Sequence, residues 1–343
     1  MKQFLFLVLG IYLIGIIFYL AIFYYQLKPL PVEAGLQNQT VQFIVQKGDS
    51  FKEIAERLEE QGLIRSSKSF KVYLLIHGWA NKLQPGVYQI TYGSDASTIA
   101  KTLVAGMPAE KTIIIPEGYT LLDIEKKLKK EEVLGDGESL LTLKISDFQK
   151  DYDFLKNAPP TATLEGFLFP DTYRFKINSP ARLIAKRMLD NFQKILTPEI
   201  QTALQNTSLN FYQIITLASL IEGEIPLEED RPVVSGILLK RLESQMPLQV
   251  DVTIVYIKCN ILQVENCRQL SSADFKIDSP YNTYQNLGLP PGPVNNPGQS
   301  AIKAALNPIE NPYWYYLSDP KTGKTIFSKT LKEHNAAKAQ YLK

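Results

Sequence analysis

The sequence has few of the residues that build metal or redox centres. Among its 343 residues are only two cysteines, Cys259 and Cys267, and two histidines, His77 and His334. Because a zinc site needs several such ligands at close spacing, we expect no metal site and no cofactor. The two cysteines either form a disulfide in an oxidising compartment or stay unpaired.

An excess of charge of one sign is also absent. The chain has 37 basic and 35 acidic residues, so its formal net charge is +2. This balance gives no electrostatic reason to expect a nucleic-acid partner. With 45% hydrophobic and 21% charged residues, the composition is typical of a folded protein large enough for two or three domains.

The N-terminal segment lacks charge altogether. Residues 4–25 contain no charged side chain, and as a helix they would extend roughly 33 Å, enough to cross a bilayer core. A cleaved secretory signal usually has a shorter apolar region, so we expect a retained anchor. Residues 1–28 then form a cytoplasmic stub and transmembrane helix in the inner (cytoplasmic) membrane. Residues 29–40 are a linker, and the body lies outside the cytoplasm.

A short pattern occurs twice, seventy positions apart. The segment FIVQKGDSFKEIAERL (43–58) aligns without gaps with IIIPEGYTLLDIEKKL (113–128). Each copy predicts a strand, a glycine turn, and a helix that begins with a Ser or Thr cap followed by an acid three residues later. Residues 41–106 predict a small α+β module that resembles the LysM glycan-binding module, although a spacer domain would share the pattern. Residues 107–158 predict a second small strand–helix unit.

The stretch ITLASLIEGEIP (215–226) places two carboxylates at the end of an apolar helix. We expect a buried helix over about 209–222 with Glu222 at its C-terminal end. There, desolvation and the helix dipole both favour the protonated carboxyl, which can act as a general acid. The alternative is a glutamate that turns outward to water. Glu224 should point elsewhere and support the site or bind substrate.

Six motifs in fixed order resemble the endolytic murein transglycosylase (YceG-like) family over roughly residues 40–343. They are EGFLFPDTY (165–173), LASLIEGE (217–224), RPVVSGILLKRL (231–242), MPLQVDVTIVY (246–256), SPYNTY (279–284) and GLPPGPVNNPG (288–298). The resemblance implies an α+β protein with a mixed α+β catalytic domain over 159–343.

The activity that this resemblance implies is cleavage of the MurNAc-GlcNAc β-1,4 bond within peptidoglycan glycan strands. The C6 hydroxyl of the muramic acid attacks C1 and leaves a 1,6-anhydroMurNAc end. One glutamate then suffices, because the internal nucleophile replaces a second carboxylate. Internal cleavage fits termination of nascent strands, with cell-wall synthases as partners.

The resemblance also implies residue roles. Glu222 is the expected catalytic acid, and Glu165, Asp171 and Glu224 are expected to support the site. The substrate-binding residues are expected to be Gln249, Asp251, Thr253, Tyr281, Asn282 and Tyr284. The chain departs from the family pattern at Val252 and Thr325, and the Cys259–Cys267 segment is not part of that pattern.

Two other functions remain open at this stage. A muramidase that uses water would need a second carboxylate near Glu222, for which Glu165 and Asp251 are candidates. A membrane-tethered scaffold would instead bind peptidoglycan without cleaving it, and the module at 41–106 would be its working part.

Overall fold

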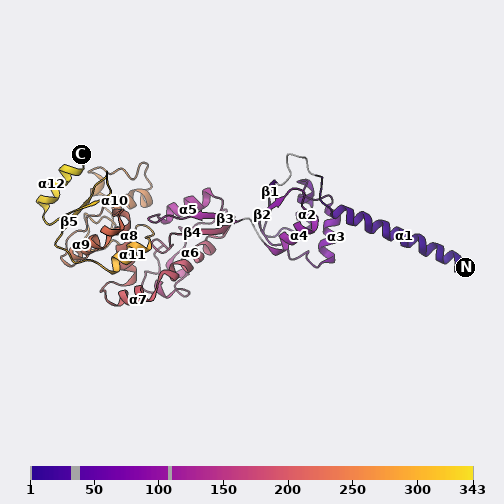
Figure 1. The fold of residues 1–343 in the computed structure, drawn as a ribbon, viewed down its shortest axis with the longest axis horizontal. Coiled ribbons are helices and arrows are strands. Elements are labelled where there is room, and N and C mark those ends of the chain that lie inside the picture. The colour runs from indigo at the N-terminus through magenta and orange to yellow at the C-terminus, as the bar shows by residue number, and fades with distance from the viewer. Residues whose placement is uncertain (1, 32–38, 107–109, 343) are drawn as a thin grey trace. The chain divides into compact units, whose positions relative to one another are not determined.

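The computed structural model describes residues 2–31, 39–106 and 110–342. The chain forms two compact units, which are described separately (Figure 1). The first comprises residues 1–111 with 176–178, and the second comprises residues 112–175 with 179–343. Helices and strands alternate irregularly along both units, which confirms the predicted α+β class.

The chain begins with a long apolar helix, α1 (Lys2–Leu27). Within it, Gly10–Leu27 has a mean hydropathy of 1.8, and none of this window is buried against the rest of the protein. A helix of this length and composition is compatible with a single-pass membrane protein.

The first unit contains a two-stranded sheet. In the sequence, helices precede, separate and follow its two strands. Its elements after α1 are β1 (Thr40–Val45), α2 (Phe51–Glu60), α3 (Ser67–Ile76), β2 (Gly86–Thr91) and α4 (Ala96–Ala105). Strand β1 pairs antiparallel with β2, with Thr40 opposite Thr91. The core is built from apolar side chains of all five elements, including Phe43, Leu58, Phe70, Tyr88 and Leu103.

The repeated strand–turn–helix pattern is present in both copies. Ser50 and Glu53 form a capping box at the start of α2. Thr120 and Asp123 form the corresponding box at the start of α5 (Leu121–Lys130). Each box satisfies backbone N–H groups that a helix start leaves without partners. The predicted helix starts are therefore confirmed.

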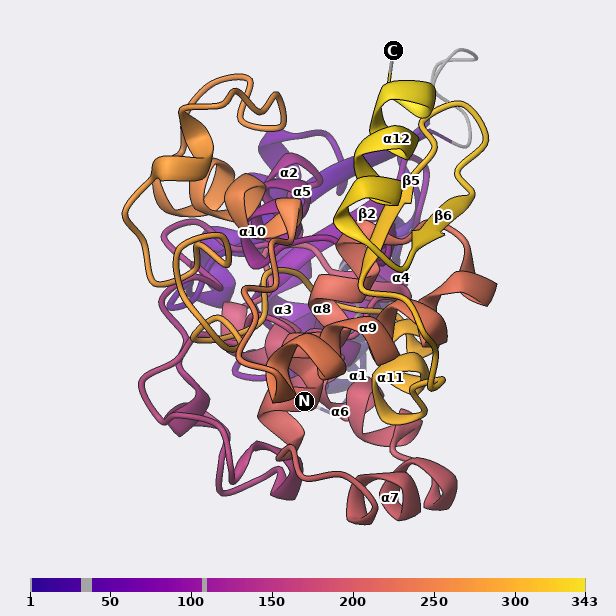
Figure 2. The ribbon, with the colours of Figure 1, turned by 90° about the vertical axis from the view of Figure 1, so that its left-hand side faces the viewer.

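The second unit is mostly helical, and strands β3 and β4 each begin or end just across its boundary with the first unit. Its elements are β3 (Glu110–Ile114), α5, β4 (Thr172–Lys176), α6 (Ala181–Ile195), α7 (Pro198–Gln205), α8 (Phe211–Glu224), α9 (Arg231–Glu243), α10 (Asp251–Tyr256), a π-helical turn (Ile257–Ile261), α11 (Gln299–Leu306), β5 (Tyr315–Ser318), β6 (Thr325–Ser328) and α12 (Leu331–Tyr341), with 3₁₀ turns at Ile145–Asp147, Asp153–Leu155, Glu228–Asp230 and Asp274–Lys276. Strand β3 pairs with β4, and β5 pairs antiparallel with β6. Figure 2 shows α12 lying beside the β5–β6 hairpin.

One hydrophobic core runs through this second unit, from Ile113 to Leu306. This core contains residues from both predicted segments, 107–158 and 159–343. Leu128 and Phe148 belong to the same cluster as Leu217. Helix α8 lies at its centre, because every residue from Ile214 to Ile221 is buried. The core thus fixes the axis and rotation of the helix that carries both candidate glutamates.

Helix α8 ends two residues later than the sequence pattern suggests. Asn210 caps its start, and Ile225 still donates its backbone N–H to Ile221 at 3.0 Å. Ile225 itself is extended, because the following Pro226 disfavours helical backbone at the preceding position. Glu224 is therefore the last helical residue rather than part of the loop.

Candidate active site

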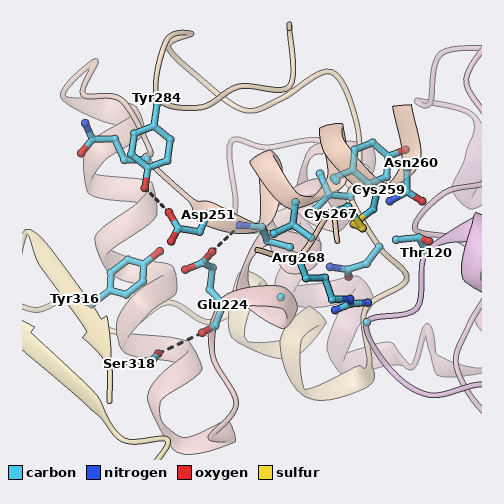
Figure 3. Close-up of a pocket in the computed structure, with 18 of the residues that line it drawn as sticks. Thr120, Glu224, Asp251, Cys259, Asn260, Cys267, Arg268, Tyr284, Tyr316 and Ser318 are labelled. Carbon is cyan, nitrogen blue, oxygen red and sulfur yellow. Dashed lines mark hydrogen bonds between the residues drawn. A yellow bond between two sulfur atoms is a disulfide. The ribbon is translucent and has the colours of Figure 1, made fainter. Parts of the chain in front are cut away.

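The second unit contains a pocket of about 820 Å³. Its walls come from the end of α8, the start of α10 with the π-helical turn after it, strand β5, helix α12 and the first turns of α5. Figure 3 shows the side chains that line it. These segments lie far apart in the sequence, so only the folded unit brings them together.

Glu224 lines this pocket. Its Oε1 accepts the backbone N–H of Val252 at 2.9 Å, and the Ser318 hydroxyl donates to its main-chain oxygen at 3.3 Å. Burial, reinforced by the negative charge of Asp251, raises the pKa of Glu224 to about 7. In the part of the chain that the structure describes, no cation pairs with this carboxyl. Near neutral pH it is therefore protonated in a large fraction of molecules, as a general acid must be.

Glu222 has different surroundings. Its Oε1 lies 2.8 Å from Nη2 of Arg231, and its Oε2 accepts from Nη1 of Arg231 at 3.3 Å and from the backbone N–H of Gly298 at 3.0 Å. Burial raises the pKa of Glu222, while the Arg231 charge and the Gly298 hydrogen bond act in the opposite direction. The side chain is only 7% exposed and is not among those that line the pocket.

The two glutamates cannot face the same way. Residues two apart on an α-helix point about 200° apart around its axis. With Glu222 directed at Arg231, Glu224 is directed at the start of α10 and the pocket. The two carboxyls therefore have different surroundings: Glu222 faces Arg231, and Glu224 faces the pocket.

Three of the six residues expected to bind substrate line the pocket. They are Gln249, Asp251 and Tyr284. The Tyr284 hydroxyl donates a hydrogen bond to Oδ1 of Asp251, as Figure 3 shows. Gln249 has φ of 52° and donates its backbone N–H to Thr283 at 3.1 Å, which holds its loop at the pocket edge. Asp251 therefore lies between Tyr284 and the region of Glu224.

The other three lie outside the pocket lining. Thr253 is fully buried and donates its hydroxyl to the main-chain oxygen of Val250 at 2.7 Å. Asn282 is also buried, and its side-chain N–H groups donate to the main-chain oxygens of two residues at 2.8 and 3.1 Å. The ring of Tyr281 lies 5.1 Å from that of Tyr256. These contacts hold the loops that carry the pocket residues.

Glu165 and Asp171 also lie away from the pocket lining. Both oxygens of Glu165 accept the backbone N–H of Leu121, at 2.9 and 3.1 Å, and Oε1 also accepts from Asn296 at 3.2 Å. Burial raises the pKa of Glu165 to about 8. Oδ2 of Asp171 accepts from the Asn191 amide at 2.7 Å. Glu165 thus connects the start of α5 to the loop before α11, and Asp171 connects the start of β4 to α6.

Several pocket residues carry buried polar atoms that have no hydrogen-bond partner within the described ranges. They are Oδ1 of Asn260, Oδ1 of Asn295, the hydroxyl of Tyr316 and Nδ1 of His334. Because buried polar atoms are normally paired, each of these four atoms can take one further hydrogen bond. The sequence did not single out Asn260 or Tyr316, which lie outside the six motifs, nor Asn295, which lies inside the motif at 288–298.

The structure joins Cys259 and Cys267 in a disulfide, and both cysteines line the pocket. Cys259 lies in the π-helical turn that follows α10. The segment outside the family pattern is thus part of the candidate active site.

Comparison with known proteins shows the family of the chain. The model of the YceG-like family matches residues 43–340, so the chain belongs to that family. An endolytic murein transglycosylase of Bacillus subtilis strain 168 is 33% identical over 327 residues, which cover 91% of this chain and 87% of that protein.

Two further proteins are similar to this chain. An endolytic murein transglycosylase of Streptococcus pneumoniae D39 is 29% identical over 336 residues, but the match spans only 60% of that longer protein. The 2.6 Å crystal structure of a YceG-like protein from Listeria monocytogenes superposes with a TM-score of 0.55 at 30% identity. It covers 88% of this chain and all of the other.

Proposed function

We propose that this chain is an endolytic murein transglycosylase, a lyase that cleaves the MurNAc-GlcNAc β-1,4 bond within peptidoglycan glycan strands. The observation that carries this proposal is Glu224, whose carboxyl lines the pocket, has a pKa raised to about 7 and pairs with no cation among the described residues. The names of the family's relatives support the same activity.

Glu224 performs both proton transfers. It donates its proton to the glycosidic oxygen O4 of the leaving sugar as the C1–O4 bond breaks. The C6 hydroxyl oxygen of the muramic acid then forms a bond to C1, and its proton passes to the Glu224 carboxylate. The product ends in 1,6-anhydroMurNAc, no water is consumed, and the acid is regenerated.

Asp251 assists without taking a proton. Its negative charge helps to keep the pKa of Glu224 near neutrality, and its hydrogen bond from Tyr284 holds the two side chains in one orientation. Gln249, Asp251 and Tyr284 bind sugar hydroxyls along the pocket. Glu222 is a positioning residue, since its ion pair with Arg231 anchors the end of α8 to the start of α9.

The N-terminal unit places this activity at the membrane. Helix α1 serves as a single-pass anchor with its N-terminus in the cytoplasm and the body outside, and the disulfide fits an oxidising extracytoplasmic space. The module at residues 41–106 follows this anchor, and its order of elements, β1–α2–α3–β2, supports a LysM-like glycan-binding role. Cleavage beside the membrane would terminate nascent strands next to a cell-wall synthase.

Mass spectrometry of glycan strands incubated with the full chain tests the proposal. The wild type should release fragments that lack one water relative to hydrolysis, and Glu224→Gln should release none. Fragments that retain the water would instead make the protein a muramidase, with Asp251 as the second carboxylate. Binding without any cleavage by the folded wild type would favour the scaffold function.

A further inference from the structure

One wall of the pocket is built by the segment that the disulfide closes. Helix α10 passes into the π-helical turn Ile257–Ile261, and the chain returns to that turn through the Cys259–Cys267 bond. We call residues 259–268 the disulfide wall. It contributes Cys259, Asn260, Gln263, Val264, Cys267 and Arg268 to the pocket lining. Figure 3 shows Asn260, the disulfide and Arg268 across the pocket from Glu224, Asp251 and Tyr284.

The disulfide wall presents a cation that the protein does not neutralise. In the described residues the exposed Arg268 guanidinium forms neither an ion pair nor a hydrogen bond, and the same holds for Lys126, which lines the pocket from α5. By contrast, the neighbouring Lys258 has partners within the protein. Its Nζ lies 2.9 Å from Oδ2 of Asp274 and donates to the main-chain oxygen of Gln269 at 2.6 Å.

A hydrogen-bond acceptor accompanies these two cations. Oδ1 of Asn260 is buried, belongs to a pocket-lining residue and has no partner among the described groups. A carboxamide oxygen accepts N–H groups, and a guanidinium binds carboxylates through its planar fork. An amide N–H occurs both in a peptide and in the acetamido group of an N-acetyl sugar, so it is the carboxylate preference of the two cations that points to a peptide.

We propose that the disulfide wall is a subsite for the peptide stem that hangs from the muramic acid of the substrate. This inference rests on the proposed function and names the part of the substrate that this wall recognises. Arg268 binds a stem carboxylate, Lys126 adds to the positive potential, and Asn260 accepts a peptide N–H. The disulfide holds the wall in its binding shape before substrate arrives, which lowers the entropy lost on binding.

A binding experiment tests this without requiring cleavage. The full-length Glu224→Gln protein is titrated calorimetrically with glycan strands that carry peptide stems and with the same strands after an amidase has removed the stems. We expect about three- to tenfold tighter binding of the stem-bearing strands, the range for one partly exposed charge-assisted contact.

Further substitutions in the Glu224→Gln protein show which residues cause the preference for stem-bearing strands. Arg268→Gln should remove most of it, and Arg268→Lys should keep part of it. Lys276→Gln is the matched control, since it removes a nearby exposed positive charge that does not line the pocket, and it should keep the full preference. The pair Cys259→Ser/Cys267→Ser should weaken the preference, because the wall is then no longer tied to the π-helical turn.

Three results would overturn the proposal. The first is equal affinity of the protein for strands with and without stems, and the second is an Arg268→Gln variant that loses the same affinity for both. The third is tighter binding of a phosphate-bearing wall polymer than of stem-bearing strands. Failure of the wild type to cleave strands counts against the proposed activity alone. The binding preference then decides the subsite independently.

Discussion

Glu222→Gln is expected to lower the stability of the protein, whereas Glu224→Gln is expected to lower its activity. Glu222 and Arg231 form a buried ion pair, with side chains only 7% and 5% exposed. Removing one partner of such a pair leaves the other charge buried and typically costs about 3–5 kcal/mol. Glutamine still offers an oxygen to the Arg231 guanidinium or to Gly298, so we expect about 2–3 kcal/mol. For a unit of this size, that loss lowers Tm by roughly 5–10 °C.

Glu224→Gln removes no partner of a buried cation. A glutamine oxygen can still accept the Val252 N–H, which the carboxylate now accepts at 2.9 Å. The free energy of unfolding should therefore change by less than about 1 kcal/mol. The proton donor is lost, however, and loss of a general acid lowers kcat by about 10²–10⁴-fold.

Thermal unfolding and strand cleavage, measured on the same preparations, separate the two effects. Glu222→Gln should melt earlier but keep cleaving at a temperature where it is folded, and Glu224→Gln should melt like the wild type and not cleave. The double variant Glu222→Gln/Arg231→Gln should recover part of the lost stability, because no unpaired charge remains. A Glu222→Gln protein that melts normally and is inactive, beside an active Glu224→Gln protein, would refute the reasoning.

Three further predictions concern pH and backbone. If Glu224 is the general acid proposed above, with a pKa of about 7, kcat should fall as pH rises above that value, and Asp251→Asn should move the fall to lower pH. Glu165 has a pKa of about 8 in the folded state against a usual 4.5, so the folded protein holds a proton that the unfolded chain releases. Its stability should therefore decrease between about pH 5 and pH 8, and calorimetry of Glu165→Gln should show a flatter dependence of Tm on pH. Gly166→Ala should lower the free energy of unfolding by about 1–3 kcal/mol in denaturant titrations, because φ is +87° and the new Cβ would lie 2.5 Å from Pro293.

Much of the local structure follows from the sequence alone. The charge-free N-terminus predicts α1, and the two Ser/Thr caps with acids three residues later predict the starts of α2 and α5. The continuous apolar run before Glu222 predicts that α8 is buried on all sides. These features depend on backbone hydrogen bonding and apolar periodicity, which neighbouring residues determine.

The order of motifs also indicates the protein family without any structure. The family model confirms it over residues 43–340. Of the residues then expected at the site, Gln249, Asp251, Glu224 and Tyr284 do line the pocket. Thr253 and Asn282 fall within equally recognisable motifs, yet they are buried and serve the loops. A motif shows which segments matter, but it does not show which side chains are accessible.

Only the tertiary structure shows how the surroundings of Glu222 and Glu224 differ. By sequence both end the same apolar helix, and helical geometry requires only that they point in different directions. Arg231, from the following helix, forms an ion pair with Glu222, while the start of α10 and strand β5 surround Glu224, whose carboxyl forms no ion pair among the described residues. A carboxyl's pKa depends on the charges and the solvent around it. Residues distant in sequence supply both, so the pKa difference between these two carboxyls follows only from the folded chain.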